Sequence, residues 1–172
     1  MKKWSITLVL LALVIIGIAI PAGAKDETNA YTPVPKSQNT QAAYISDLYG
    51  KDGKLYAVKD EIEWLEGEDA NRLFREEYPD AGFDTAPDGY MIVNKEEKQE
   101  AVQVSPNAEV LMQAYSKTGD PADLDIQWNE PVTLDTFQSL LESPQGELLK
   151  EYPYHLTIED GIVTKIVQQY IP

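Results

Sequence analysis

The chain has 172 residues, no cysteine and one histidine, and its 14 basic and 29 acidic residues give a formal net charge of −15. This length fits one domain, and 43% hydrophobic residues are enough for a packed core. Without cysteine, disulfides, thiolate metal sites, a cysteine nucleophile and a lipidated N-terminal cysteine are all excluded. The acidic excess argues against binding to nucleic acid or to anionic membranes, since both need a basic surface.

The first 24 residues are typical of a secretory signal peptide. Two lysines precede 17 uncharged residues, Trp4–Ile20, and Pro21 ends this run. Small residues then stand at the two positions that a signal peptidase reads, Ala22 and Ala24, which predicts cleavage after Ala24. The alternative is an uncleaved membrane anchor, because 17 residues lie at the short end of a membrane span. In both cases the rest of the chain is predicted to be exported.

Residues 25–41 are predicted to form a flexible tether. They contain Pro33, Pro35 and several polar residues, with no helical or strand period. Periodic segments begin after this stretch. Residues 42–172 are therefore predicted to form a single globular α+β domain.

The first predicted element of that domain is a β-hairpin made of Tyr44–Tyr49 and Lys54–Asp60. Asp52–Gly53 favours a tight turn between them, because both residues tolerate a positive φ. The second strand is predicted to continue through Leu65. There Ile62 and Trp64 would face one side of the sheet and the intervening acids the other.

A helix is predicted over Glu68–Tyr78. Its apolar residues lie at the i, i+3, i+4 and i+8 spacing of one helix face: Ala70, Leu73, Phe74 and Tyr78. Acids in its first turn would be stabilised by the positive N-terminal end of the helix dipole. Pro79 is predicted to end the helix.

Short strands follow at Tyr90–Asn94, Gln99–Val104 and Glu109–Tyr115, with a turn at Pro106–Asn107. Ser116–Pro131 is predicted to be a long polar loop, because it lacks a clear period.

The C-terminal part begins with a predicted helix, Leu134–Leu141, capped by Thr133. The segment Ser143–Gly146 ends it. A last hairpin is predicted from Tyr152–Glu159 and Ile162–Tyr170, joined by an Asp-Gly turn. Tight turns between most strands predict a mainly antiparallel sheet, either small and curved or closed into a partly open barrel. It would hold about seven strands with two short helices.

Several phrases occur together in one order: Tyr44–Asp47, Ile62–Ala70, Asp88–Asn94, Thr133–Phe137, Tyr152–Tyr154, Asp160–Ile166 and Gln169–Pro172. In this order the chain resembles a family of uncharacterised secreted and lipoprotein-like proteins from Gram-positive, Bacillus-type bacteria. The resemblance covers nearly all of residues 44–172 and implies an extracytoplasmic location. It implies no activity and no catalytic residues. Relatives with a lipid anchor would carry a lipobox cysteine, which this chain lacks.

Few residues are candidates for catalysis. His155 is the only histidine, and no Gly-x-Ser-x-Gly elbow accompanies it, so a semi-exposed structural role on a strand is expected. No His-Glu-x-x-His zinc motif and no glycine-rich phosphate loop occur. A hydrolase that uses paired Asp or Glu carboxylates stays open, because acids are abundant.

Candidate binding residues are aromatic and acidic. Trp64, Trp128 and Tyr170 could line a groove for a sugar or a peptide, although such aromatics more often lie in a core. Glu61 and Glu63 belong to an acid-rich stretch that could attract Ca²⁺ weakly at the surface, and no other cofactor is expected.

The sequence as a whole favours an exported acidic protein without catalytic activity, secreted or held at the extracellular face of the membrane. It would act as a binding or accessory module for an unidentified protein or cell-wall component. It would touch the membrane only through an uncleaved N-terminal segment. A small extracellular hydrolase and a structural surface protein are the alternatives.

Overall fold

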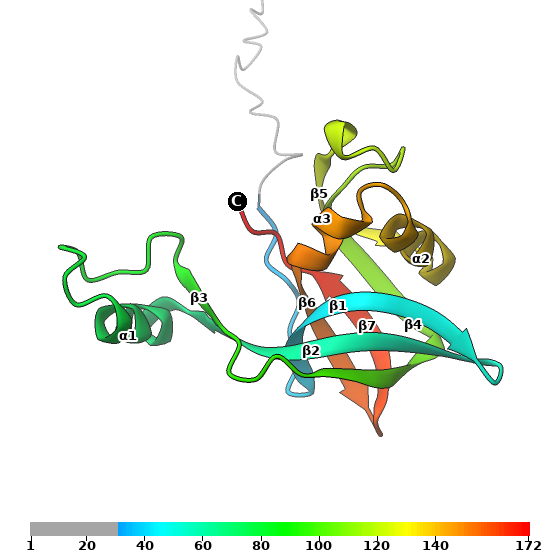
Figure 1. The fold of residues 1–172 in the computed structure, drawn as a ribbon, viewed down its shortest axis with the longest axis horizontal. Helices are drawn as coiled ribbons and strands as arrows, with labels where there is room; N and C mark the ends of the chain where they lie inside the picture. The colour runs from blue at the N-terminus through cyan, green and yellow to red at the C-terminus, as the bar shows by residue number, and fades with distance from the viewer. Residues whose placement is uncertain (1–30) are drawn as a thin grey trace, which may run out of the picture.

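The computed structural model describes residues 31–172, so the predicted signal peptide, with Ala22 and Ala24, lies outside the described residues. The described part is mostly β-sheet: a closed five-stranded barrel, two further strands and three short α-helices (Figure 1). None of these helices is long and apolar enough to cross a membrane. The mainly antiparallel sheet of about seven strands is thereby confirmed. Of the two predicted forms, a curved sheet or a partly open barrel, the structure has a barrel that is closed, and it has one helix more than predicted.

The barrel closes through a circular series of strand pairs. β1 (Thr40–Lys51) pairs with β2 (Lys54–Glu66) on one side and with β6 (Pro153–Glu159) on the other. β6 pairs with β7 (Ile162–Gln168), which runs parallel to β4 (Gln99–Tyr115). The first part of β2, Leu55–Asp60, also pairs antiparallel with β4, and this pairing closes the barrel. Closure leaves no free edge among these five strands.

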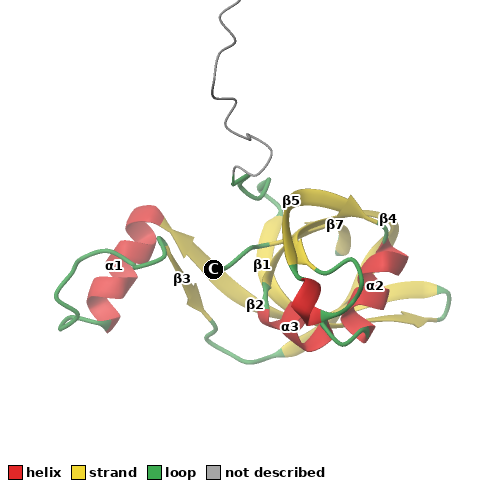
Figure 2. Cartoon of the chain, turned by 90° about the horizontal axis from the view of Figure 1, so that it is seen from above, coloured by secondary structure: helices red, strands yellow, loops and turns green. Residues whose placement is uncertain are grey.

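The remaining elements lie outside the ring. β3 (Tyr90–Val93) pairs with the far end of β2, and α1 (Gly67–Glu77) connects these two strands. β5 (Asp125–Val132) pairs with β4 and follows a short 3₁₀ turn, Pro121–Asp123. α2 (Leu134–Glu142) and α3 (Gly146–Glu151) lie together beside the barrel (Figure 2).

Both predicted Asp-Gly turns are confirmed. Asp160 and Gly161 have φ values of +50° and +77°, and Asp52 and Gly53 have +52° and +73°. Two successive residues with positive φ are the signature of the type I′ turn, whose twist matches that of the flanking strands. Local turn chemistry therefore sets the register of the β1–β2 and β6–β7 hairpins.

Side chains fill the barrel. Tyr154, Ile45, Leu48 and Met112 are almost completely buried, and Phe137 of α2 reaches them from outside the sheet. The Phe137 and Tyr154 rings meet edge to face with centroids 5.6 Å apart. α2 thus adds its apolar face to the barrel core, as its predicted stripe requires.

Three local predictions are wrong. The predicted loop Ser116–Pro131 contains β5, an edge strand on which Pro131 needs no ladder hydrogen bond. The predicted turn at Pro106–Asn107 lies inside β4, where the register with β7 shifts between Val104 and Glu109. α3 was missed because its six residues are too few for a periodic pattern.

The described N-terminal segment contacts the barrel before β1 begins. Val34 is buried against Leu111 and Val167. The Gln113 side-chain amide donates a hydrogen bond to the Thr32 carbonyl oxygen at 3.2 Å. Residues 31–39 of the predicted tether therefore lie along the outside of the sheet, and its last two residues, Thr40 and Gln41, belong to β1.

Candidate functional site

The most distinctive feature of the fold is an arm, which we define as residues 63–93. β2 pairs with β1 as far as Ile62 and then continues out of the barrel, where it pairs with β3. α1 and the loop of residues 78–89 cap the two strands. Both views show this arm projecting from the barrel (Figures 1 and 2).

The arm has a small core of its own. Ala70 and Phe74 on α1 are buried with Ala86 of the loop, and Leu65 and Met91 of the two strands pack beside them. α1 contacts mainly the strands of the arm. The apolar side chains of the arm therefore pack mainly on one another.

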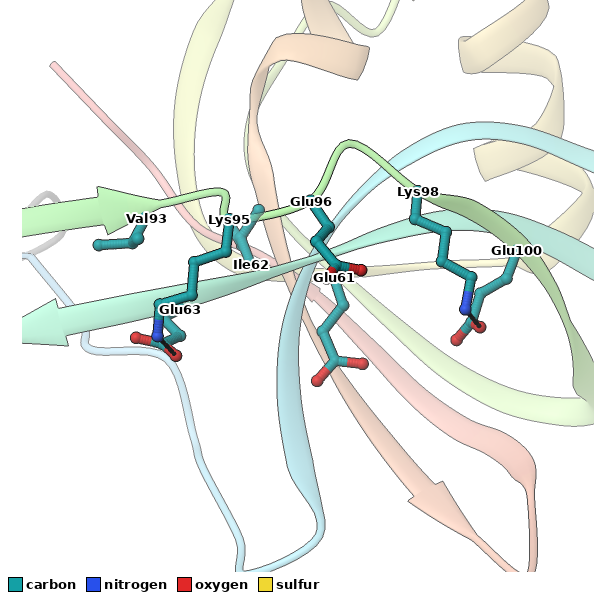
Figure 3. Close-up of a pocket in the computed structure, with 8 residues that line it drawn as sticks. All are labelled: Glu61, Ile62, Glu63, Val93, Lys95, Glu96, Lys98 and Glu100. Atoms are coloured by element: carbon teal, nitrogen blue, oxygen red, sulfur yellow. Dashed lines mark hydrogen bonds and ion pairs between the residues drawn. The ribbon is translucent and has the colours of Figure 1, made fainter.

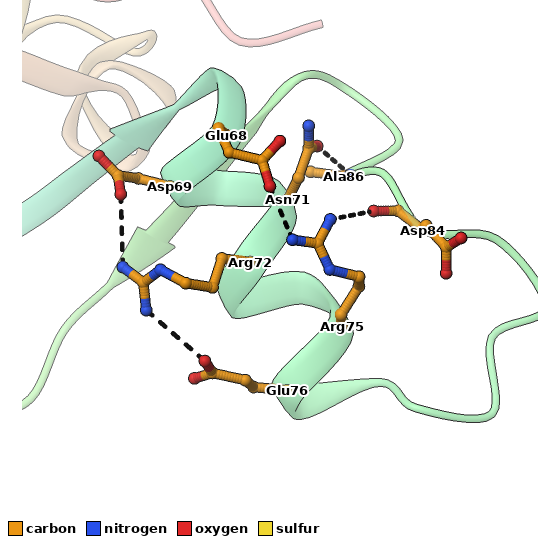
Figure 4. A network of polar contacts seen from close by, with 8 residues as sticks. All are labelled: Glu68, Asp69, Asn71, Arg72, Arg75, Glu76, Asp84 and Ala86. Carbon is orange, nitrogen blue, oxygen red and sulfur yellow. Dashed lines mark hydrogen bonds and ion pairs between the residues drawn. The ribbon is translucent and has the colours of Figure 1, made fainter.

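Polar contacts hold the loop of the arm against α1 (Figure 4). The side-chain amide oxygen (Oδ1) of Asn71 accepts a hydrogen bond from the Ala86 backbone N–H at 2.9 Å. The Arg75 guanidinium donates to the Asp84 carbonyl oxygen at 3.1 Å and to the Glu68 carboxylate at 2.7 Å. This pairing lowers the pKa of Glu68 below its ordinary value. The loop is thus fixed in place by side chains from two turns of the helix.

An aromatic cluster lies at the end of the arm, and we call it the tip: Phe74, Tyr78 and Phe83. The Phe74 ring stacks on Phe83 with centroids 5.2 Å apart and contacts Tyr78 at 5.3 Å. Phe74 is buried, but Tyr78 and Phe83 are 53% and 52% exposed. Two large rings are therefore held open to solvent by a third ring beneath them.

Acidic residues predominate around the tip. Arg72 forms ion pairs with Asp69 at 3.4 Å and with Glu76 at 3.6 Å. Among the described residues, no basic side chain forms an ion pair with the remaining acids beyond the start of α1: Glu77, Asp80, Asp84 and Asp88. Both arginines of the arm are thus already paired, and its outer end is negatively charged.

A groove of about 340 Å³ lies where the arm joins the barrel (Figure 3). It contains both acids predicted as weak cation ligands. Glu63 forms an ion pair with Lys95 at 2.7 Å, and Glu61 pairs with Lys59 at 3.2 Å. The Lys59 side chain is only 3% exposed and also contacts Glu100 at 2.8 Å.

Lysines thus form ion pairs with three of the four acids that line this groove, Glu61, Glu63 and Glu100. Burial alone would lower the pKa of Lys59, but its hydrogen bonds to Glu100 and Glu61 outweigh burial and raise that pKa above its ordinary value. Lys59 therefore stays charged. Within residues 31–172 no group of three or more acidic or histidine side chains is placed to hold a metal ion.

The three predicted aromatic candidates do not form one site. Trp128 and Tyr170 lie together with ring centroids 5.4 Å apart, and Tyr31 contacts Trp128 at 5.1 Å. Trp64 lies in a separate cluster, stacked on Tyr90 at 4.4 Å. Trp64 thus helps to join the arm to the barrel.

His155 is buried, so its predicted semi-exposed position is wrong. Only 3% of it is exposed, because β6 is flanked by β1 and β7 in the barrel and the Trp64 ring packs perpendicular to the imidazole with centroids 6.0 Å apart. Its Nε2 lies 3.2 Å from the Gln169 side-chain oxygen. Burial and the nearby Lys36 charge lower the pKa of His155 to about 4. This histidine is therefore neutral near pH 7.

The sequence reasoning missed the tip. It placed Tyr78 on the buried stripe of the helix, and this prediction is wrong, because α1 ends at Glu77 and Tyr78 caps it with a non-helical backbone. Phe83 belonged to no predicted element. Its position between Gly82 and Asp84, in a polar turn, was the one signal available, since a bulky ring in such a turn has no core to enter.

Comparisons of the chain with family models, with curated proteins and with solved structures found no match. The resemblance to secreted Bacillus-type proteins therefore stays a prediction.

Proposed function

We propose that this protein is an exported, non-catalytic binding module at the bacterial cell surface, and that the arm contacts its partner. The exposure of Tyr78 and Phe83 carries this proposal. Exposed aromatic rings that are fixed by their neighbours are typical of binding sites, because little side-chain freedom is lost on association. The remaining support comes from the fold and from the groove.

The barrel supports a binding role by analogy of fold. Numbered among themselves, the barrel strands β1, β2, β4, β6 and β7 have the order 1-2-3-5-4, with strands 3 and 5 parallel. This is the arrangement of the oligonucleotide/oligosaccharide-binding barrel, which binds ligands on strands 2 and 3. The arm is inserted between those two strands. The fold does not identify the ligand, and the charge of −15 argues against an oligonucleotide.

The groove supports binding over hydrolysis. A carboxylate hydrolase needs one acid with a raised pKa opposite a second acid. Glu61 and Glu63 instead each form an ion pair with a lysine, so neither is a free carboxylate opposite a second acid. A purely structural role, the other alternative, gives no reason for exposed rings at the end of an arm.

The first experiment tests whether the tip contacts a partner in cells. A photoreactive benzoylphenylalanine is placed at Phe83 of the full chain, in bacteria that naturally make it. The control carries the same group at Leu148 of α3, which is also an exposed apolar residue, at 38%. We expect a discrete crosslinked product from position 83 and not from position 148. Equal products from both positions, or none from position 83, would overturn the proposal.

Export is tested separately. Protease added to intact cells should remove the full-length protein if the domain lies outside the membrane. N-terminal sequencing then distinguishes cleavage after Ala24 from a retained anchor. A protein that is protected from protease until the cells are lysed would refute the surface location.

A further inference from the structure

We infer that the tip binds a basic protein segment, which places one apolar side chain against Tyr78 and Phe83 and its lysines or arginines near the surrounding acids. This inference rests on the proposed binding function of the arm. It names the chemistry of the partner from two observations, the shape of the apolar surface and the sign of the charge around it.

The apolar half of the contact is preorganised. Phe83 stacks on Phe74 with an interplanar angle of 21°, and Tyr78 is tilted by 31° to the same ring. Arg75 and Asn71 hold the loop that carries Phe83. An incoming aliphatic side chain would cover rings that already have their final positions, so most of the burial energy remains available for affinity.

The charged half of the contact has one sign. Residues 67–89 contain seven acids and two arginines, and both arginines are paired with acids of the same helix. The acids without a basic partner among the described residues lie at the end of α1 and in the loop that carries Phe83. A basic segment would be steered to this end of the arm and would compensate those charges.

The same charges disfavour the other occupants. If a second copy of this chain bound through its own tip, two acidic surfaces would meet, and each chain carries a net charge of −15, so the two copies would repel each other. An anionic membrane or an acidic polymer would be repelled for the same reason. The projection of the arm leaves its end accessible, away from the barrel (Figure 1). A basic peptide or the basic edge of another protein therefore fits the site best.

Binding of dye-labelled peptides to the full chain, purified in a neutral detergent, tests this inference. The probe peptide has one leucine flanked by lysines. Two control peptides replace the lysines by glutamates or the leucine by serine. Fluorescence anisotropy at about 50 and 300 mM salt measures the affinity. We expect the lysine–leucine peptide to bind tightest and to weaken with salt, because exposed charges are screened at high ionic strength.

Matched variants locate the site. Tyr78→Ser and Phe83→Ser should each weaken binding about fivefold or more, as expected for loss of an anchoring ring. Asp80→Asn with Asp84→Asn should weaken it about fivefold at low salt and flatten the salt dependence. Leu148→Ser, and Glu147→Gln with Glu159→Gln, are the controls on the barrel side and should change affinity less than about twofold.

The outcomes separate this inference from the proposed function. Equal binding of the lysine and glutamate peptides, or no binding of either, would overturn the basic partner. Equal affinity for the wild type and for the folded Tyr78→Ser and Phe83→Ser variants would overturn the apolar anchor. If crosslinking from position 83 persists in either case, the arm still binds a partner, but of another chemistry.

Discussion

His155 shows how a single side chain can look functional in the sequence and be structural in the fold. It is the only histidine, but it contacts Gln169 and lies perpendicular to the Trp64 ring in a buried position. Its low pKa follows mainly from burial, which disfavours the charged ring. The consequence of that pKa is a pH-dependent stability.

Acid should destabilise the fold through this residue. The ordinary pKa of histidine is 6.5 and that of folded His155 is about 4, so between these pH values the unfolded state binds the proton first. Stability is complete above about pH 6.5 and falls as the pH drops towards 4, with a loss of about 2 kcal/mol at about pH 5.

Urea unfolding at pH 7 and pH 5 measures this effect. His155→Gln is the comparison, because glutamine keeps a polar side chain without the titration. We expect the variant to lose clearly less stability than the wild type between the two pH values. Equal losses would refute the assignment of the effect to His155.

Gly146 is a second position where one atom matters. A Cβ on this residue would collide with the carbonyl oxygen of Leu141, at the sharp connection between α2 and α3. Gly146→Ala should therefore lower the free energy of unfolding by about 1–3 kcal/mol, the usual cost of overpacking. Gly50→Ala is the control, since nothing lies within 4 Å of the added carbon. Thermal unfolding of the two variants checks this, and similar melting temperatures would contradict it.

At the scale of elements, the strand β2 belongs both to the barrel and to the arm. Its first part belongs to the barrel, and its last residues belong to the arm. Glu66 and Tyr90 are cross-strand partners, so the two strands of the arm already stand at hairpin distance where α1 begins. The arm could therefore be shortened without rerouting the chain.

Replacement of residues 67–89 by an Asn-Gly turn should leave the barrel folded. The removed residues form their own small core, while the stacked Trp64 and Tyr90 remain. We expect cooperative unfolding with a melting temperature within about 5 °C of the wild type. Calorimetry measures this, and loss of the cooperative transition would show that the barrel needs the arm.

The parts of the fold that sequence can predict are local. The two Asp-Gly turns and the stripe of α2 were predictable, because their determinants lie within a few residues. The closure of β2 on β4 and the parallel pairing of β4 with β7 were not, because those contacts join distant segments. β5 was hidden because six of its eight residues are half-buried, without a clear alternation of apolar and polar residues.

The candidate site was less predictable than the fold. Tyr78 fits a helical stripe in sequence, and only the end of α1 at Glu77 turns it outward. Whether Glu61 and Glu63 are free to bind cations also could not be judged from the sequence. Glu61 pairs with Lys59 of the same strand, and Glu63 pairs with Lys95 of the connection between β3 and β4. Exposure and ion pairing are properties of the assembled fold.

At the scale of the whole molecule, the two ends of the described chain meet on one side. Gln113 donates to the Thr32 carbonyl oxygen and accepts a hydrogen bond from the Tyr170 backbone N–H. Val34 adds an apolar contact with Leu111 and Val167. The segment before β1 therefore contributes to the stability of the barrel.

Truncation should reveal that contribution. A chain that starts at Thr40 loses Val34 and one hydrogen-bond acceptor of Gln113, the Thr32 carbonyl oxygen, so its free energy of unfolding should fall by about 2 kcal/mol relative to a chain that starts at Tyr31. Urea unfolding of the two forms measures this difference. Equal stability would mean that the segment only rests on the surface.

The continuity of β2 also has a mechanical consequence. A partner that pulls on the end of the arm pulls along this strand, which enters the barrel between β1 and β4. Hydrogen bonds on both of its sides then carry the force together, because β2 is one unbroken strand from Lys54 in the barrel to Glu66 in the arm. Tension applied to the arm along β2 would therefore reach the barrel through the hydrogen bonds of β2 with both neighbouring strands.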